Sequence, residues 1–212
     1  MGHAMKIVYL GRQSRRVTPA PDMEGDVLEL LADNWDDYGN KTTFATTCRI
    51  EGKRVELGYL KLMLEDADSS ERKLDKLREE GWNGIFPIPG TRYLSLPGEI
   101  SFYEQLRDRL GEAAAKQAAQ QLRDASYLVY IEQDPDALAL IDTQAFRKSL
   151  QRERGEIKSY LDGWKIFAAA SMAVLDLGFR FNDVYGDLST LNLKFSQRGL
   201  LPHGVNVLIG PN

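Results

Sequence analysis

TTFATTCRI-EGK-RVELGYLKLML, residues 42–64, is the most informative stretch for the fold of this chain. Residues 42–50 and 54–64 are both rich in the β-branched, aromatic and long apolar side chains that favour strands. The link Glu51-Gly52-Lys53 is short and contains glycine, as hairpin turns do. We therefore expect an antiparallel hairpin here. Residues 6–10 predict a further strand, and residues 27–31 a strand or a short helix, so the N-terminal third is expected to form a small, mostly antiparallel sheet.

Helical signals dominate the middle of the chain. The sequence DSSE at residues 68–71 resembles a capping box, and Gly81 and Gly111 suit helix ends. Residues 85–96, with two prolines, are expected to be extended. Asp134-Pro135 is typical of a helix start. Apolar spacing predicts a long helical pair over residues 143–161 and 164–177, ended by Gly178. Residues 179–181, 191–195 and 205–209 then read as strands, so the expected fold class is α+β.

Composition limits the kinds of site this chain can build. It has 212 residues and a formal net charge of −4, so no global positive field favours nucleic acid. Cys48 is the only cysteine, which excludes an internal disulfide and suits a reducing cytoplasm. Residues 1–4 resemble a cloning-tag remnant, and without His3 the only histidine is His203. We expect no metal site and no membrane span.

A basic cluster is the one feature that suggests nucleic acid. Its residues are expected to share one helix: Arg147, Lys148, Arg152, Arg154 and Lys158. Acidic residues interleave with them, which favours a solvated, ion-paired face. A weak, salt-sensitive nucleic-acid patch is the alternative.

Two adjacent carboxylates suggest a second alternative, a small hydrolase. Asp36 and Asp37, with Glu56, could be read as an acid–base or metal pair. The surrounding Trp, Gly and Asn residues are typical of a turn, in which aspartates bond their own backbone. The sequence therefore favours turn chemistry, and we expect no catalytic residues.

The segment VNVLIGPN, residues 205–212, is an apolar strand pattern that runs into Gly210-Pro211-Asn212. A P-loop has the form G-x-x-x-x-G-K-[ST], and these three residues match its first three positions. The segment resembles the start of the Walker A motif in ABC-type ATPases of the SMC and RecF kind, whose loop reads G-P-N-G-x-G-K-[ST]. An ordinary strand ending in a turn is the alternative.

This resemblance implies a domain organisation. Residues 5–178 would form an accessory α+β domain, and residues 179–212 the first strands of an ATPase head. In such heads an antiparallel hairpin precedes the P-loop strand and lies near the adenine, so the resemblance implies that Tyr185 could stack on the base; packing of Tyr185 within the sheet is the alternative. ATP and Mg²⁺ would be cofactors of the longer protein. This chain itself would bind neither, because the phosphate-binding lysine is missing.

Two further segments resemble bacterial ATPases that carry an extra domain before the P-loop, some of them from phage-defence systems. They are residues 34–44, NWDDYGNKTTF, and residues 93–106, YLSLPGEISFYEQL, in which Pro97 and Glu99 depart from the pattern. The resemblance implies an accessory domain that recognises a protein partner, or self-association through the head. A stand-alone protein- or nucleic-acid-binding module is the alternative.

Overall fold

The computed structural model describes residues 5–12, 25–33, 35–36, 39–168, 174–182 and 188–196. The chain forms two compact units, Met1–Phe167 and Ala168–Asn212. The sequence placed the boundary near Gly178, but the chain divides after Phe167 and Gly178 lies inside a strand. The first unit contains a five-stranded sheet followed mainly by helices, which confirms the coarse α+β expectation.

The sheet has the order β1-β2-β3-β4-β5. Its strands are β1 (Lys6–Arg12), β2 (Val27–Ala32), β3 (Thr43–Ile50), β4 (Lys53–Leu64) and β5 (Tyr93–Pro97). The predicted β3–β4 hairpin is confirmed, and β2–β3 and β4–β5 are also antiparallel. However, β1 runs parallel to β2, so the sheet is mixed. Residues 13–26 separate the two strands, and a connection of about a dozen residues suffices for a parallel crossover.

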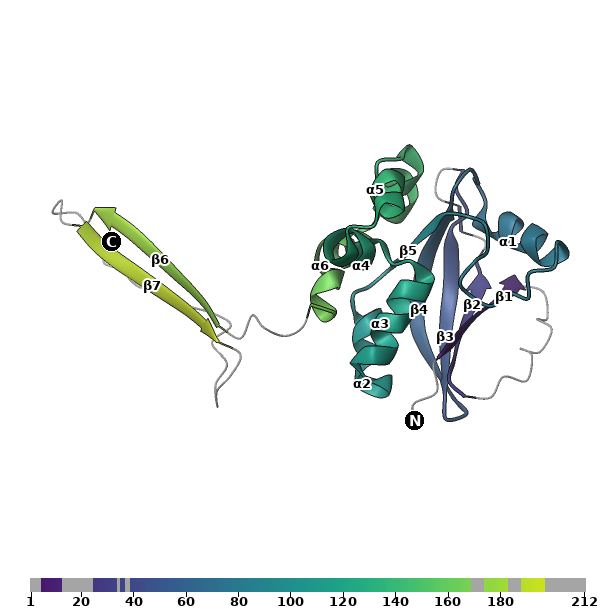
Figure 1. Ribbon diagram of the computed structural model, residues 1–212, viewed down its shortest axis with the longest axis horizontal. Coiled ribbons are helices and arrows are strands. Elements are labelled where there is room, and N and C mark those ends of the chain that lie inside the picture. Colours follow the sequence, from purple (N-terminus) through teal and green to yellow (C-terminus); the bar gives the residue numbers. More distant parts are fainter. Residues whose placement is uncertain are drawn as a thin grey trace. The chain divides into compact units, whose positions relative to one another are not determined.

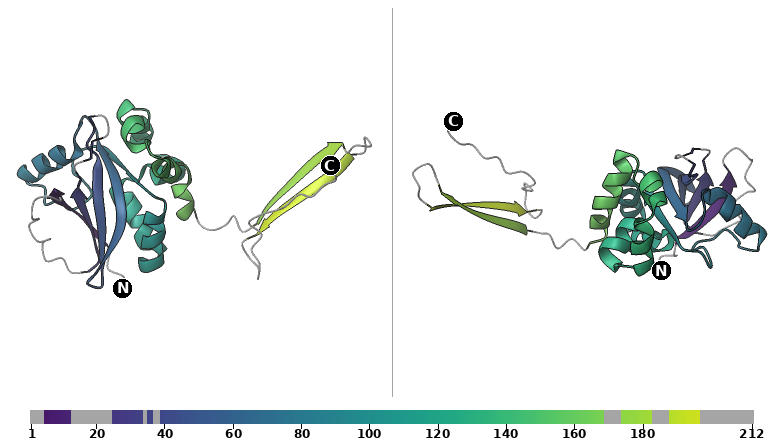
Figure 2. Two further views of the ribbon diagram at one scale, coloured as in Figure 1. Left: turned by 180° about the vertical axis from the view of Figure 1, so that it is seen from behind. Right: turned by 90° about the horizontal axis from the view of Figure 1, so that it is seen from above.

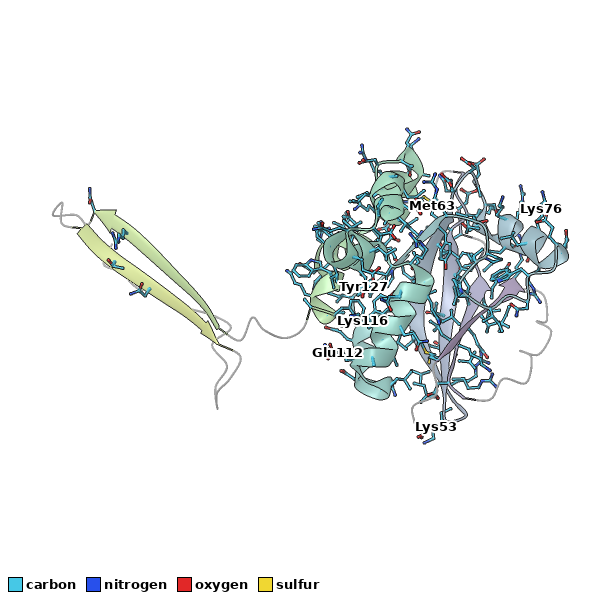
Figure 3. The ribbon with its side chains drawn as sticks, in the orientation of Figure 1. Lys53, Met63, Lys76, Glu112, Lys116 and Tyr127 are labelled. Atoms are coloured by element: carbon cyan, nitrogen blue, oxygen red, sulfur yellow. The ribbon has the colours of Figure 1, made fainter. Side chains whose placement is uncertain are left out.

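A β-bulge shifts the register in the β3–β4 pair. Thr46 pairs with Gly58 and Thr47 with Glu56, so Leu57 is the extra residue, and it is buried. Gly58 has a φ of 88°, a conformation that favours glycine, and the Thr46 hydroxyl donates to its carbonyl oxygen over 2.9 Å. The bulge sets which residues of β4 face which side beyond this point. Figure 3 labels Lys53 and Met63, which lie at opposite ends of this long strand.

Neither edge of the sheet is open along its centre. On the β1 edge, Tyr9 N–H donates to the Gly84 carbonyl and Phe86 N–H to the Ile7 carbonyl, over 2.8 and 2.9 Å. On the β5 edge, Ser95 N–H donates to the Arg123 carbonyl over 3.0 Å. Loops therefore occupy hydrogen-bonding positions that another chain would need for strand addition.

The helices of the first unit pack on this sheet. Figure 1 shows α1 near β1 and β2, with α2 and α3 on the side of β4. Figure 2 shows α2 and α3 side by side. Shorter helices and single helical turns follow α3 and complete the first unit. The full set is α1 (Ser70–Glu79), α2 (Ser101–Leu110), α3 (Glu112–Leu122), α4 (Ala125–Tyr127), the π-helical turn η1 (Leu128–Glu132), α5 (Pro135–Ile141), the π-helical turn η2 (Phe146–Leu150), α6 (Arg154–Asp162) and the 3₁₀ turn η3 (Gly163–Ile166).

The predicted ends of α2 and α5 are confirmed, and the start of α1 lies one residue later than predicted. Asp134 caps α5, where its carboxylate accepts from Ala137 N–H over 2.8 Å, and Gly111 ends α2. At α1 the cap is Ser69, one residue after the predicted start of the capping box. With Ser69 as the cap, the third helical position is Arg72, so Glu71 lies one position too early to complete a capping box. Its side chain accepts two hydrogen bonds from Arg12 of β1.

The predicted long helical pair is wrong. Residues 143–161 are broken by 151–153 into η2 and α6, and residues 174–177 belong to strand β6. Leu175 and Leu177 are two positions apart, the spacing of one face of a strand, and in the structure they pair with Phe195 and Leu193 of a second strand. No helix in the described part of the chain is both long and apolar enough to cross a membrane.

The second unit contains a two-stranded antiparallel sheet. Strand β6 (Val174–Asn182) pairs with β7 (Leu188–Ser196) from Val174–Ser196 to Asn182–Leu188 without a register shift. The predicted hairpin between residues 179 and 195 is therefore confirmed, and β6 begins earlier than expected.

Candidate functional site

A buried ion pair joins the sheet to α6. Thr43 pairs with Lys61 and Ala45 with Tyr59 across β3 and β4, so Tyr59 and Lys61 lie on the same face of the sheet. On that face the Lys61 ammonium lies 3.6 Å from Glu156 Oε1, and their side chains are 3% and 0% exposed. Buried charges persist in proteins when they are paired and hydrogen-bonded, and this pair meets both conditions.

Both oxygens of the Glu156 carboxylate accept hydrogen bonds in addition to the ion pair with Lys61. The Tyr59 hydroxyl donates to Oε1 over 3.2 Å, and the N–H groups of Arg152 and Glu153 donate to Oε2 over 3.0 and 2.9 Å. The bond from Glu153 N–H is one half of the capping box that starts α6; in the other half the Glu153 side chain accepts from the Glu156 N–H. The bond from Arg152 N–H is an additional one. Glu156 therefore both caps its own helix and anchors the helix to β4.

Two glycines allow this close approach. A Cβ atom at Gly98 would lie 2.2 Å from the Tyr59 ring, and one at Gly155 would lie 2.3 Å from the Gly98 carbonyl oxygen. The Gly98 N–H also donates to the Tyr59 carbonyl over 3.0 Å. Gly98 lies in the segment that resembles the bacterial ATPases, and its structural role is to receive the Tyr59 ring.

A pocket of about 390 Å³ opens beside the ion pair, and we call it the Trp35 pocket. It lies between the end of β2, the β3–β4 pair and the start of α6. Trp35 is 57% exposed, whereas Thr43 is buried and its hydroxyl oxygen has no hydrogen-bond partner. Among the described residues, its lining consists of Asp33, Trp35, Thr43, Tyr59, Lys61, Glu153 and Glu156.

The charge of the Trp35 pocket is negative. Three carboxylates and one ammonium line it, which gives a formal charge of −2 (−3 and +1). The ammonium is held against Glu156, and the Arg152 guanidinium lies 3.5 Å from the Glu153 carboxylate. Burial, and then the charge of Glu156, raise the pKa of Tyr59 and keep its phenol protonated. These described side chains suit ligand binding better than proton transfer, because Glu156 is saturated and Tyr59 is a poor acid.

The predicted nucleotide residues Tyr185, Gly210, Pro211 and Asn212 lie outside the residues that the structure describes. Comparison of the chain with protein-family models, curated proteins and solved structures found no match. The ATPase resemblance therefore remains a prediction that depends on the motif and the hairpin.

The basic cluster does not lie on one helix, as the sequence predicted. Arg147 and Lys148 belong to η2, Arg154 and Lys158 to α6, and Arg152 to the link between them. Arg147 lies 3.7 Å from the Asp142 carboxylate. Four of the five side chains are exposed, with Arg152 half-buried. The break arises because the Glu156 capping box starts a new helix at this point.

Two carboxylates of the hydrolase alternative, Asp36 and Glu56, are described by the structure, and both are exposed. Asp36 is exposed and accepts a hydrogen bond from Gly39 N–H, which is the turn chemistry expected from the sequence. Asp37 lies outside the described residues, and Glu56 is exposed on β4 opposite Thr47. Within the described ranges, no group of three or more His, Cys, Asp or Glu residues is placed to hold a metal ion.

The sequence analysis did not predict a buried polar cluster formed by Asp124, Tyr103 and Ser95. Asp124 is 1% exposed, caps α4 by accepting from Tyr127 N–H over 2.8 Å, and burial raises its pKa to about 7. Burial, and then the Asp124 carboxylate, raise the pKa of Tyr103. Asp124 Oδ2, Tyr103 OH and Ser95 Oγ are buried without hydrogen bonds of good geometry. The Asp124 cap itself had a sequence signal, an aspartate three residues before Tyr127, but the burial had none.

Proposed function

We propose that this chain is the accessory, partner-recognition part of an ABC-type ATP-binding protein. In this proposal the first unit recognises a protein partner, and the β6–β7 hairpin begins the ATPase head. Gly210-Pro211-Asn212 would open the P-loop, and Tyr185 would lie beside the adenine of ATP bound with Mg²⁺. The lone Cys48 suits a cytoplasmic protein, and the resemblance suggests a role in phage defence.

The hairpin is the observation that carries this proposal. Its two nine-residue strands form a sheet of their own, distinct from the five-stranded sheet. An isolated two-stranded hairpin is at best marginally stable in water, so these strands need further strands or a packed helix to complete a core. An ATPase head, in which such a hairpin precedes the P-loop strand, would supply them.

Partner recognition by the first unit is supported by its surface. The blocked sheet edges disfavour binding by strand addition. The Trp35 pocket combines the exposed indole of Trp35, the phenol ring of Tyr59 and charged side chains of both signs in one concave site. Recognition sites commonly have such a mixture of aromatic and polar groups.

Nucleotide binding tests the ATPase part. The gene sequence after the codon for Asn212 should encode Gly, a variable residue, Gly-Lys and Ser or Thr. Calorimetry should then detect Mg²⁺-dependent ATP binding by a protein with that whole P-loop. Residues 1–212 alone should show none at sub-millimolar ATP, because the loop amides and lysine that hold phosphate are not among them. A stop codon, a continuation without the lysine, or micromolar ATP binding by residues 1–212 would overturn the proposal.

The second candidate is a stand-alone binding module, and the Trp35 pocket favours it because all of the described residues that line the pocket belong to the first unit. The gene sequence after the codon for Asn212 distinguishes the two candidates, because only the ATPase proposal requires a P-loop there. A chain without a P-loop that still binds ligand in the pocket would be such a module.

A further inference from the structure

We propose that the exposed face of α6 binds an acidic amphipathic helix of a partner protein. The inference rests on the partner-recognition half of the proposed function and does not depend on the ATPase head. Figure 1 shows α6 at the border of the first unit opposite α1. We call this face, with the aromatic rings next to it, the α6 surface. It consists of the apolar residues Tyr130, Ile157, Leu161 and Trp164 and the basic residues Arg154 and Lys158.

An apolar stripe runs along the exposed side of α6. Ile157, Leu161 and Trp164, the last in η3 directly after α6, are spaced at i, i+4 and i+7, so they lie on one side. Ile157 is 39% exposed and Leu161 is 51% exposed. The Trp164 indole N–H donates to the Leu161 carbonyl over 3.0 Å and holds the ring beside the stripe. Single exposed apolar side chains are common, but a contiguous group marks an interaction site.

Aromatic contacts fix one end of the stripe. The Tyr130 ring of η1 stacks on the Trp164 ring, with 5.9 Å between their centres, and lies 5.6 Å from the ring of Tyr160. Tyr160 is buried, whereas Tyr130 is half-exposed. The surface is therefore built from two segments of the chain that are already packed together. Such preorganisation reduces the entropy that is lost when a partner binds.

Basic side chains border the stripe. Arg154 and Lys158 are exposed, and neither has an ion-pair partner among the described residues. By contrast, the two acidic residues of α6 are paired with Lys61 of β4 and Lys165 of η3. The charges that remain unpaired on this helix are therefore positive, although the whole chain has a net charge of −4. A positive border attracts acidic partners and repels basic ones.

The form of the α6 surface favours a helical partner. Side chains at i, i+4 and i+7 make a ridge that packs against the ridges of a second helix. The stripe from Ile157 to Trp164 covers about two turns, or about 10 Å along the axis. A partner helix with leucines on one side and glutamates beside them would place its leucines on Leu161 and its carboxylates near Arg154 and Lys158. Because the contact is short, we expect a modest affinity.

Single-stranded nucleic acid fits the α6 surface less well. Its bases stack on the free faces of aromatic rings, whereas the facing sides of Tyr130 and Trp164 are occupied by each other. The exposed aliphatic side chains of Ile157 and Leu161 add nothing to phosphate binding, which depends on cations. Apolar and basic groups together therefore favour an acidic amphipathic helix.

Titration of the 212-residue chain with a designed peptide tests the proposal. The peptide has about 15 residues, with leucines on one side of the helix, glutamates beside them and alanines elsewhere. The indole N–H signal of Trp164, assigned in ¹H–¹⁵N spectra with a Trp164→Phe variant, should shift saturably with a Kd on the order of 100 µM. The Trp82 signal should stay in place. A glutamine counterpart without charge and a scrambled peptide without an apolar side should each bind at least about threefold more weakly.

Matched variants locate the binding on α6. Leu161→Ser should weaken binding of the acidic peptide about tenfold, because the apolar contact is lost, whereas Leu161→Met keeps that contact and should bind within about twofold. Lys158→Gln should weaken binding about threefold. Lys76→Gln removes an exposed charge from α1, labelled in Figure 3, and should change Kd by less than about twofold. Circular dichroism verifies folding, and the exposed Lys158 provides the test even if Leu161→Ser unfolds.

Several results would overturn the proposal. They are equal binding of the acidic and glutamine peptides, equal effects of Lys158→Gln and Lys76→Gln, and no Trp164 shift up to about 2 mM peptide. Tighter binding of single-stranded DNA or of phosphatidylserine vesicles than of the acidic peptide would replace it with a nucleic-acid or membrane surface. The gene sequence after the codon for Asn212 tests the ATPase head separately, so failure of the α6 surface and failure of the head are distinguishable.

Discussion

The Lys61 ammonium of β4 lies 3.6 Å from the Glu156 carboxylate of α6, and both side chains are almost completely buried. Tyr59, which donates to the same carboxylate, is 97 positions away from it in the sequence. The Lys61–Glu156 ion pair joins the β3–β4 hairpin, whose strands are adjacent in the sequence, to α6 near the end of the first unit. It also forms the wall of the Trp35 pocket, so its integrity affects both stability and binding.

Removing one partner of this pair should be strongly destabilising. Lys61→Met leaves the Glu156 carboxylate buried without its cation, which costs about 3–5 kcal/mol. The double variant Lys61→Met/Glu156→Leu removes both charges and should be more stable than Lys61→Met alone. Urea unfolding monitored by tryptophan fluorescence measures both. Lys76→Met breaks an exposed pair, Lys76–Glu80, and should leave the urea midpoint nearly unchanged. A Lys61→Met midpoint equal to that of the wild type would show that the pair is not buried in solution.

The two glycines beside Tyr59 should not tolerate a side chain. Gly98→Ala would place a methyl group within 2.2 Å of the Tyr59 ring and is expected to cost about 1–3 kcal/mol. Gly155→Ala should cost more, because its first contact is a backbone carbonyl oxygen that cannot rotate away. In a double-mutant cycle, Tyr59→Ala should relieve much of the Gly98→Ala penalty. Additive effects of these two substitutions would contradict the contact.

Asp124 should make stability depend on pH. Its folded pKa is about 7, above an unfolded value of about 3.9, so the folded state binds more protons between these limits. The stabilisation is present below about pH 4 and is lost as the pH rises through 7. Asp124→Asn keeps the helix cap without the charge. Its advantage over the wild type should be small at about pH 4, should already be measurable at pH 5, and should grow to an amount on the order of a few kcal/mol at pH 8.

Thermal unfolding of wild type and variant across pH 5–8 measures this difference. Asp134→Asn, at the aspartate that caps α5, is the matched control and should show no such growth in the difference with pH. A constant gap between Asp124→Asn and the wild type from pH 5 to pH 8 would refute the buried-carboxylate explanation.

The basic cluster should bind DNA only weakly. The whole chain carries a net charge of −4, and Arg147 is near Asp142 as Arg152 is near Glu153. Any binding should therefore be lost between about 50 and 200 mM salt, since counterion release drives it. Fluorescence anisotropy with labelled duplex DNA provides the measurement. Tight binding at physiological salt that Lys158→Glu abolishes would instead favour a nucleic-acid module.

Features that depend on neighbouring residues could be predicted from local sequence patterns. The β3–β4 hairpin, the cap at Asp134, the stop at Gly111 and the turn at Asp36 all have the expected form. Each depends on backbone preferences or hydrogen bonds within a few positions, so local patterns suffice to predict it.

The meeting of distant segments could not be predicted in this way, because it depends on the packing of the whole fold. In the folded chain β1 is parallel to β2, Glu71 pairs with Arg12 of β1, and residues 174–177 form a strand that pairs with β7. The candidate pocket likewise depends on Lys61 and Glu156 meeting. Local patterns show which face of an element is apolar, but the choice among partners is made by burial and pairing summed over the whole core. For that reason the hairpin, the turn at Asp36 and the helix ends at Asp134 and Gly111 could be predicted from the sequence, whereas the helical pair was mispredicted and the pocket required the folded chain.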